Sequence, residues 1–174
     1  MKPLSFFVRG RAATAGSKRG FALKKNGVYT GRVAMIGMNK EEKNWKATIA
    51  AWATHAMKQA GITELMMGPV RLEVTFVMQR PKYHLNSKGL VKPQFQSDRH
   101  ISTPDEDKLL RCLKDALTQV VWRDDSQVCT ALVLKRYGPI PGAQVTISED
   151  AEESPISLPK IPENIPQQET LSLT

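Results

Sequence analysis

Residues 103–128 read TPDEDKLLRCLKDALTQVVWRDDSQV, and this stretch carries the most regular helical pattern of the chain. Its apolar side chains recur at intervals of one, three or four residues, at Leu109, Leu110, Leu113, Leu117 and Val120. Such spacing places them on one side of a helix. We therefore predict a helix over residues 105–120 that buries this side against a core.

Acidic residues flank the predicted helix at both ends. Asp105, Glu106 and Asp107 stand at its start, and Asp124 and Asp125 follow it in a turn before a strand. Each cluster has an ordinary explanation, since a carboxylate at a helix N-terminus contributes about 0.3–1 kcal/mol and aspartates are common in turns. Together they also have a chemical use, because Mg²⁺ takes carboxylate oxygens and can activate water for phosphodiester cleavage. Whether the two clusters meet depends on tertiary folding.

The charge of the chain favours a polyanionic partner. Its 174 residues contain 25 Lys and Arg against 17 Asp and Glu, a net charge of +8. Residues 150–174 hold five acidic residues and one lysine, a charge of −4, which leaves +12 on residues 1–149. We predict a basic domain over 1–149, suited to nucleic acid, and an acidic, Pro-rich disordered tail over 150–174. Solubility alone is the plainer explanation of the charge.

The composition excludes several classes of protein. No apolar run approaches the roughly 18 residues that span a bilayer, and the N-terminal apolar stretch is too short for a signal peptide. Cys112 and Cys129 cannot form a disulfide scaffold, and their spacing with His84 and His100 fits no common zinc pattern. We expect two buried free thiols in a cytoplasmic protein.

The remaining elements predict an α/β (α+β) fold, a small mixed β-sheet with two main helices packed on one face. Strands are predicted at residues 4–8, 70–78, 128–137 and 143–147, a helix at 40–60, and a hairpin turn at 26–27. Trp45 and Trp52 fall at helical spacing, so we expect both in the core. Residues 79–104 form a long basic segment with three prolines, and loops of this length are usually functional or disordered.

The stretch of residues 103–128 resembles the RusA-type Holliday-junction resolvases, which are small dimeric Mg²⁺-dependent endonucleases. The family pattern begins Asp-x-Asp-Asn-Leu-x-Lys, continues with Asp-Ala-Leu, and closes on an aromatic residue and Asp-Asp-x-Gln-Val. Residues 105–111, 115–117, 122 and 124–128 match these parts in order. The rest of residues 1–149 fits the family's order of elements.

The resemblance implies the roles of particular residues. It assigns metal binding and catalysis to three carboxylates, Asp105, Asp107 and Asp125, with Mg²⁺ as cofactor and Mn²⁺ as a substitute. Lys108 stands where the family commonly has Asn, and Arg111 stands where it has a catalytic lysine. Arginine keeps the positive charge but has no neutral form, so Arg111 suits phosphate clamping rather than general-base work. The alternative for Arg111 is an ion pair with Asp107 or Asp115 on the same helix face.

The function implied is an endonuclease that resolves four-way junctions by paired symmetric nicks from a homodimer. A phage origin and a bacterial or infected-host cytoplasm follow by resemblance. The alternative is a non-catalytic junction- or duplex-DNA-binding protein of the same fold, whose acidic residues only cap the helix. A scaffold that recruits a partner through the acidic tail is a third class. The candidate DNA contacts are Lys18, Arg19, Arg80, Lys82, Lys88, Lys92, Arg99 and Lys108.

Overall fold

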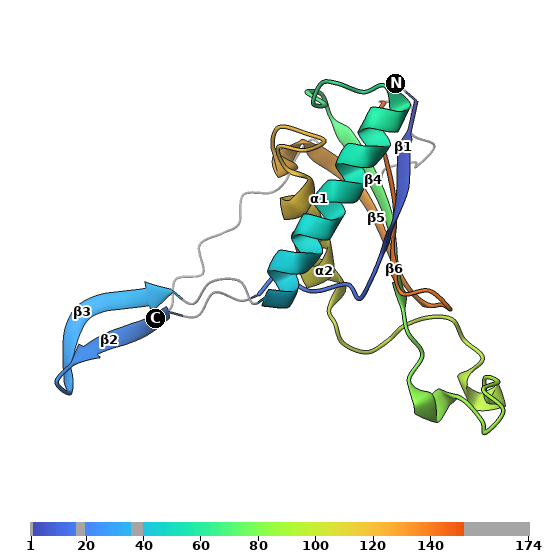
Figure 1. Ribbon diagram of the computed structural model, residues 1–174, viewed down its shortest axis with the longest axis horizontal. Helices are drawn as coiled ribbons and strands as arrows, with labels where there is room; N and C mark the ends of the chain where they lie inside the picture. The colour runs from blue at the N-terminus through green and yellow to red at the C-terminus, as the bar shows by residue number, and fades with distance from the viewer. Residues whose placement is uncertain (1, 17–19, 36–39, 152–174) are drawn as a thin grey trace, which may run out of the picture.

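The sheet is the frame of the molecule in a computed structural model that describes residues 2–16, 20–35 and 40–151 (Figure 1). Its four strands lie in the order β1 (Leu4–Arg9), β6 (Gly142–Glu149), β4 (Val70–Met78) and β5 (Val128–Tyr137). β6 runs antiparallel to both of its neighbours, whereas β4 and β5 are parallel. The predicted small mixed sheet is thus confirmed.

Both helices cover the same face of this sheet, as predicted (Figure 1). They are α1 (Lys40–Ala60) and α2 (Glu106–Leu117). In β4 every second residue from Val70 to Met78 is buried, which is the period of a strand with one covered face. Trp45 and Ile49 of α1 and Leu109 and Leu113 of α2 join the same hydrophobic core. Each such side chain contributes about 1.5–3 kcal/mol by leaving water.

α2 is shorter than the periodicity predicted, because the chain reverses soon after Leu117. Gln119 has a positive φ of 62° and its backbone N–H donates to the carbonyl of Trp122 at 2.8 Å. This turn buries Val121 and Trp122 in the core, although they no longer belong to the helix. Apolar spacing alone could not separate the helix from this buried turn.

Two core expectations are wrong. Trp52 is 43% exposed, because the buried side of α1 runs through Trp45, Ile49, Ala53 and Met57 and leaves Trp52 beside it. Cys129 is exposed on the edge strand β5, whereas Cys112 is buried as expected. Burial raises the pKa of the Cys112 thiol to about 11.

A two-stranded hairpin stands apart from the four-stranded sheet (Figure 1). It consists of β2 (Gly20–Lys25) and β3 (Val28–Met35). Asn26 and Gly27 have φ values of 52° and 82°, the left-handed pair that a tight hairpin turn requires. The turn predicted from this dipeptide is present.

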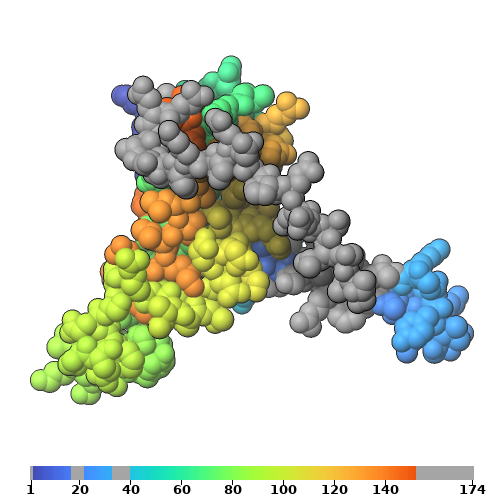
Figure 2. Space-filling model, turned by 180° about the vertical axis from the view of Figure 1, so that it is seen from behind, coloured from blue at the N-terminus to red at the C-terminus, as the bar shows by residue number. Residues whose placement is uncertain are grey.

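The long segment after β4 has little regular structure but many side-chain bonds. It contains two single-turn helices, η1 (Lys82–His84) and η2 (Pro93–Phe95), and projects as a lobe from the sheet (Figure 2). The rings of His84 and Phe95 stack at 4.1 Å, and Arg136 of β5 pairs with Asp98 at 2.6 Å. Bonds between distant side chains therefore organise this loop.

The described residues include the first two residues of the predicted tail. The backbone N–H of Asp150 donates to the carbonyl of Pro69 at 2.9 Å, and its carboxylate accepts from Thr130 at 2.7 Å. The rest of the predicted tail, residues 152–174, lies outside the described residues, as do Lys18 and Arg19. None of the helices in the described ranges is long and apolar enough to cross a membrane.

Candidate functional site

The start of α2 holds the first predicted carboxylate, Asp105. Asp105 is the N-cap residue, yet its side chain makes no capping hydrogen bond. Its carboxylate instead accepts a hydrogen bond from the ammonium group of Lys108 at 2.5 Å. That bond holds the pKa of Asp105 below its ordinary value and raises the pKa of Lys108. Because both side chains are about half exposed, the pair contributes little to folding stability.

Asp107 lies in the first turn of α2 and is exposed. Its carboxylate makes no hydrogen bond or ion pair with any described residue. Arg111 does not pair with Asp107 or Asp115, the two partners considered for it, within the described structure. Arg111 donates to the carbonyl of Gly16 at 3.2 Å, and Asp115 pairs with Lys46 at 2.8 Å. The first turn of α2 therefore exposes a carboxylate that has no hydrogen bond or ion pair with a described residue.

The acidic turn after α2 separates its two aspartates by role. Asp124 caps the short helix η3 (Asp125–Gln127): its carboxylate accepts from the backbone of Ser126 at 2.9 Å, and its own N–H donates to Gln127 at 2.9 Å. Hydrogen bonds from Ser126 hold the pKa of Asp124 below its ordinary value. Gln127 also donates to the carbonyl of Met66 at 2.9 Å, which anchors the turn. Asp124 is structural, and Asp125 is left outside the capping box.

Asp125 lies beside the far half of α2 rather than at its start. Its carboxylate is 4.0 Å from the ammonium group of Lys114. Asp107, Arg111 and Lys114 are four and three residues apart, so they lie in a row on one helix face. At 1.5 Å per residue, about 10 Å of helix axis separates Asp107 from Lys114. With Asp125 beside Lys114, the two cationic side chains lie between two carboxylates.

The three predicted metal ligands do not surround one point in this conformation. In the part of the chain that the structure describes, no three His, Cys, Asp or Glu side chains are close enough to hold one metal ion. The donor chemistry nevertheless suits a hard divalent cation, since all three groups are carboxylates. Asp105 and Asp125 already carry a cationic partner, the lysine ammonium groups, in solvent-exposed and exchangeable pairs.

The loop after β1 joins the start of α2 to α1. The N–H of Ala15 donates to the carbonyl of Lys108 at 3.0 Å, and the N–H of Gly16 donates to Glu42 at 2.8 Å. Glu42 is 3% exposed and pairs with Lys46 at 3.1 Å. By its position Glu42 is one of two acidic residues in the first turn of α1. Its burial depends on a loop 26 residues earlier in the chain, so no local signal could reveal it.

The predicted DNA-contact residues of the lobe divide into two groups. Arg80 donates to the carbonyls of Phe95 and Ser97, at 2.8 and 2.9 Å, and Lys92 donates to a backbone carbonyl within the lobe at 2.9 Å. These two cations hold the lobe together. The side chains of the other three make no hydrogen bond or ion pair with described residues and are exposed: Lys82, Lys88 and Arg99.

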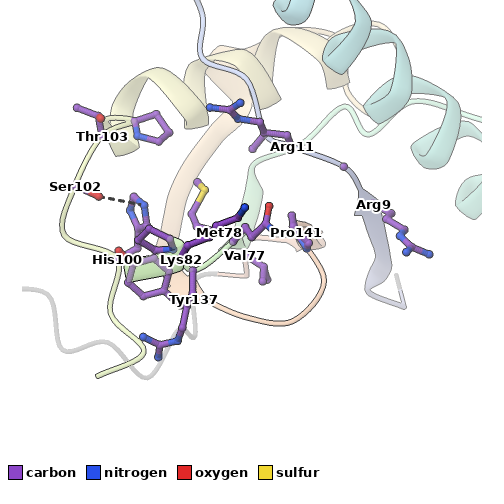
Figure 3. Close-up of a pocket in the computed structure, with 16 residues that line it drawn as sticks. Arg9, Arg11, Val77, Met78, Lys82, His100, Ser102, Thr103, Tyr137 and Pro141 are labelled. Carbon is purple, nitrogen blue, oxygen red and sulfur yellow. Dashed lines mark hydrogen bonds between the residues drawn. The ribbon is translucent and has the colours of Figure 1, made fainter. Parts of the chain in front are cut away.

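A cavity of about 630 Å³ lies beside the start of α2 (Figure 3). Its walls come from the ends of β1, β4 and β5 and from residues 100–104. Arg9 and Arg11 line it, and neither was selected from the sequence, because the pattern of β1 gives no sign of a cavity at its end. Pro104 also lines the cavity and directly precedes Asp105. The cavity thus adjoins the first predicted carboxylate.

Two comparisons with known proteins bear on these residues. The profile of a family described as "Endodeoxyribonuclease RusA" matches residues 17–148, which include the hairpin, both helices and the acidic turn. YqaN of Bacillus subtilis (strain 168), an uncharacterized protein, is 31% identical over 157 residues, 86% of this chain and 98% of YqaN. The family match confirms the resemblance noted in the sequence.

Proposed function

The chain belongs to the RusA family of endodeoxyribonucleases, and from this premise we propose that it is a Mg²⁺-dependent endonuclease that resolves four-way DNA junctions. The observation that carries the proposal is the carboxylate of Asp107. It is exposed and unpaired among the described residues, in a domain whose remaining charge is strongly positive. A cation can bind this carboxylate without first displacing another side chain.

We propose that Asp105, Asp107 and Asp125 hold the divalent cation, Mg²⁺ or, as a substitute, Mn²⁺. When bound, such an ion supplies a Lewis acid that activates water and stabilises the leaving oxygen. The chain itself fixes where these carboxylates lie. Asp124 and Gln127 hold the turn that carries Asp125, and the bond from Lys108 orients the carboxylate of Asp105.

Arg111 serves the reaction as a fixed positive charge. It lies on the same helix face as Asp107, and its guanidinium is oriented by the carbonyl of Gly16. Arginine remains protonated at any physiological pH, so Arg111 can hold a phosphate of the cleaved strand but cannot accept a proton. The family's lysine position therefore contributes charge in this chain.

The remaining assignments concern the assembly and its substrate. Paired symmetric nicks require two active sites, so we propose that the protein acts as a homodimer. Lys82, Lys88 and Arg99 are free to contact the DNA backbone, and Lys18 and Arg19 of the first loop are further candidates. We propose that the protein works in recombination and repair of DNA, in the cytoplasm of a bacterium or a phage-infected host.

A nicking assay tests the proposal. A labelled four-way junction and a linear duplex of the same arm sequence are incubated with Mg²⁺ or with EDTA. The enzyme, Asp107→Asn and the neighbouring control Glu106→Gln are compared. We expect symmetric Mg²⁺-dependent cuts in the junction, absent with Asp107→Asn and retained with Glu106→Gln. Equal activity of Asp107→Asn and wild type would overturn the assignment.

One observation favours a second candidate, a junction-binding protein that does not cleave. The described carboxylates form no three-ligand cluster, and two of them pair with lysines. Under this reading the junction is bound tightly without any cut at any Mg²⁺ concentration. The same assay, run alongside a binding measurement, separates the two candidates.

A further inference from the structure

We propose that the cavity beside the start of α2 binds one unpaired nucleotide of a DNA strand, with its phosphate on Arg11 and Lys82 and its base against His100. This inference deepens the proposed function and rests on it, since it identifies the strand that the carboxylates would act on. The cavity is distinct from the carboxylates, none of which lines it.

The cavity has the size and the shape of a small-ligand site. Its volume of about 630 Å³ falls within the roughly 300–1,000 Å³ that is typical of such sites. Arg11 lies on one side of the cavity, and His100 and Tyr137 lie on the opposite side (Figure 3). Met78 and Pro141 supply apolar wall. An elongated, partly apolar ligand fits this arrangement better than a bare ion does.

The charge of the lining calls for an anion. Arg9, Arg11, Arg80 and Lys82 line the cavity, and none of the described Asp or Glu residues does. Arg80 is engaged by backbone carbonyls and lies 4.8 Å above the ring of Tyr137. The side chains of Arg11 and Lys82, by contrast, form no hydrogen bond or ion pair with the residues that the structure describes. A concave surface with only positive charge concentrates anions, and a phosphodiester is the anion a nuclease meets.

A second feature of the cavity suits a nucleobase. The rings of His100 and Tyr137 both line the cavity, and their centroids lie 4.9 Å apart. Burial, together with the nearby Lys135, lowers the pKa of His100, which favours the neutral ring. Aromatic side chains are the usual stacking partners of bases in single strands. The base would therefore pack against the ring of His100.

The position of the cavity explains why the nucleotide would be unpaired. A concave site of this size admits a base only after the base has left the duplex stack, and that step costs least where pairing is already broken. Thr103 and Pro104 line the cavity, and Asp105 follows at once. Lys135 fixes this rim by donating to the carbonyls of Ser102 and Pro104, at 2.9 and 2.7 Å. A strand held in the cavity would continue towards the carboxylates.

Binding of a single strand tests the phosphate contacts. Fluorescence anisotropy follows a labelled oligothymidylate of about twelve nucleotides with the full-length protein in EDTA, so that no cleavage occurs. The double variant Arg11→Gln/Lys82→Gln is compared with Lys43→Gln/Lys58→Gln, which removes the same charge from exposed positions of α1. We expect at least a tenfold loss of affinity and a salt slope smaller by about 0.7 in the cavity variant, the value for one lost phosphate contact on a single strand. Equal losses in the two double variants would overturn the site.

Competition tests the base contact. Thymidine 5′-monophosphate, inorganic phosphate and a linear duplex each compete with the labelled strand for the wild-type protein and for His100→Ala. We expect the nucleotide to compete at least tenfold better than phosphate, and His100→Ala to remove most of that advantage. Equal competition by nucleotide and phosphate would leave an anion site only, and stronger competition by the duplex would exclude an unpaired base. Because these measurements need no metal, their failure leaves the nicking assay of Asp107→Asn intact.

Discussion

Both helices begin with acidic residues, but the molecule uses the two sets in opposite ways. At the start of α1, Glu42 is buried, accepts a hydrogen bond from Gly16 at 2.8 Å and pairs with Lys46 at 3.1 Å. At the start of α2, Asp107 is exposed and has no such partner among the described residues. The same sequence signal is therefore a tertiary anchor in α1 and an exposed carboxylate in α2.

The acidic turn after α2 repeats this contrast within two adjacent residues. The carboxylate of Asp124 forms a capping box with Gln127, whereas the carboxylate of Asp125 lies 4.0 Å from the ammonium group of Lys114. We expect Asp125→Asn to lower junction cleavage about 100-fold or more while the protein remains folded, because a metal ligand is lost. Asp124→Asn keeps a capping oxygen and should retain most activity. Rates of nicking under single-turnover conditions measure both, and equal losses would erase the distinction between the two aspartates.

The role of Glu42 as a structural acid can be tested through the free energy of unfolding. Replacing it with Ala leaves the N–H of Gly16 and the ammonium group of Lys46 without this partner in a part-buried site. We expect a loss of about 2–3 kcal/mol in the free energy of unfolding. Urea titration measures the loss, and cleavage per folded molecule should change little. A fully stable Glu42→Ala variant would show that α1 needs no acid there.

Arg111 tests whether the family's lysine position supplies charge or a proton acceptor. Arg111→Gln removes the charge and should slow cleavage about tenfold, while Arg111→Lys should stay within a few-fold of wild type. The pH profile decides the role, since a fixed charge adds no basic limb. A new ionisation in the pH profile of Arg111→Lys, accompanied by faster cleavage, would contradict the role assigned to Arg111.

The smallest expected effect concerns Asp105 and Lys108. The pKa of Asp105 is lowered by its bond to Lys108, so the pair's contribution to stability is complete at neutral pH and disappears as the pH falls through that lowered pKa. Lys108→Asn, which introduces the residue common in the family, should return the pKa of Asp105 towards its ordinary value. An NMR titration of the side-chain carboxyl follows this shift. Unfolding stability at pH 7 should be almost unchanged, because the pair is exposed.

Local periodicity predicted the elements that depend on local pattern. The bounds of α1, β4 and β5 follow the expected residues, because one side of each repeats at the period of its structure. The end of α2 differs from the predicted bound, because Trp122 is buried by a turn with a positive φ at Gln119. The prediction that Trp52 is buried was wrong for a related reason. Its neighbour Ala53 occupies the buried side of α1 instead.

The candidate site was predictable in its residue types and not in its environment. Asp105, Asp107 and Asp125 came from the spacing of a family motif. The division of labour between Asp124 and Asp125, the engagement of Arg80 within the lobe, and the cavity at Arg11 all depend on contacts between distant segments. Lys108 and Lys114 were likewise not foreseen as partners of the carboxylates.

The most direct test of the contrast between Asp107 and Glu42 is nicking of a labelled four-way junction by wild type, Asp107→Asn and Glu42→Gln, with Mg²⁺ and with EDTA. We expect Asp107→Asn to remain folded, with a loss of stability of at most about 1 kcal/mol, to bind the junction and to make no cut. We also expect Glu42→Gln, once its lower stability is allowed for, to cut normally. Full cleavage by Asp107→Asn, or loss of cleavage confined to Glu42→Gln, would contradict the assignment of the exposed acid to chemistry and the buried acid to structure.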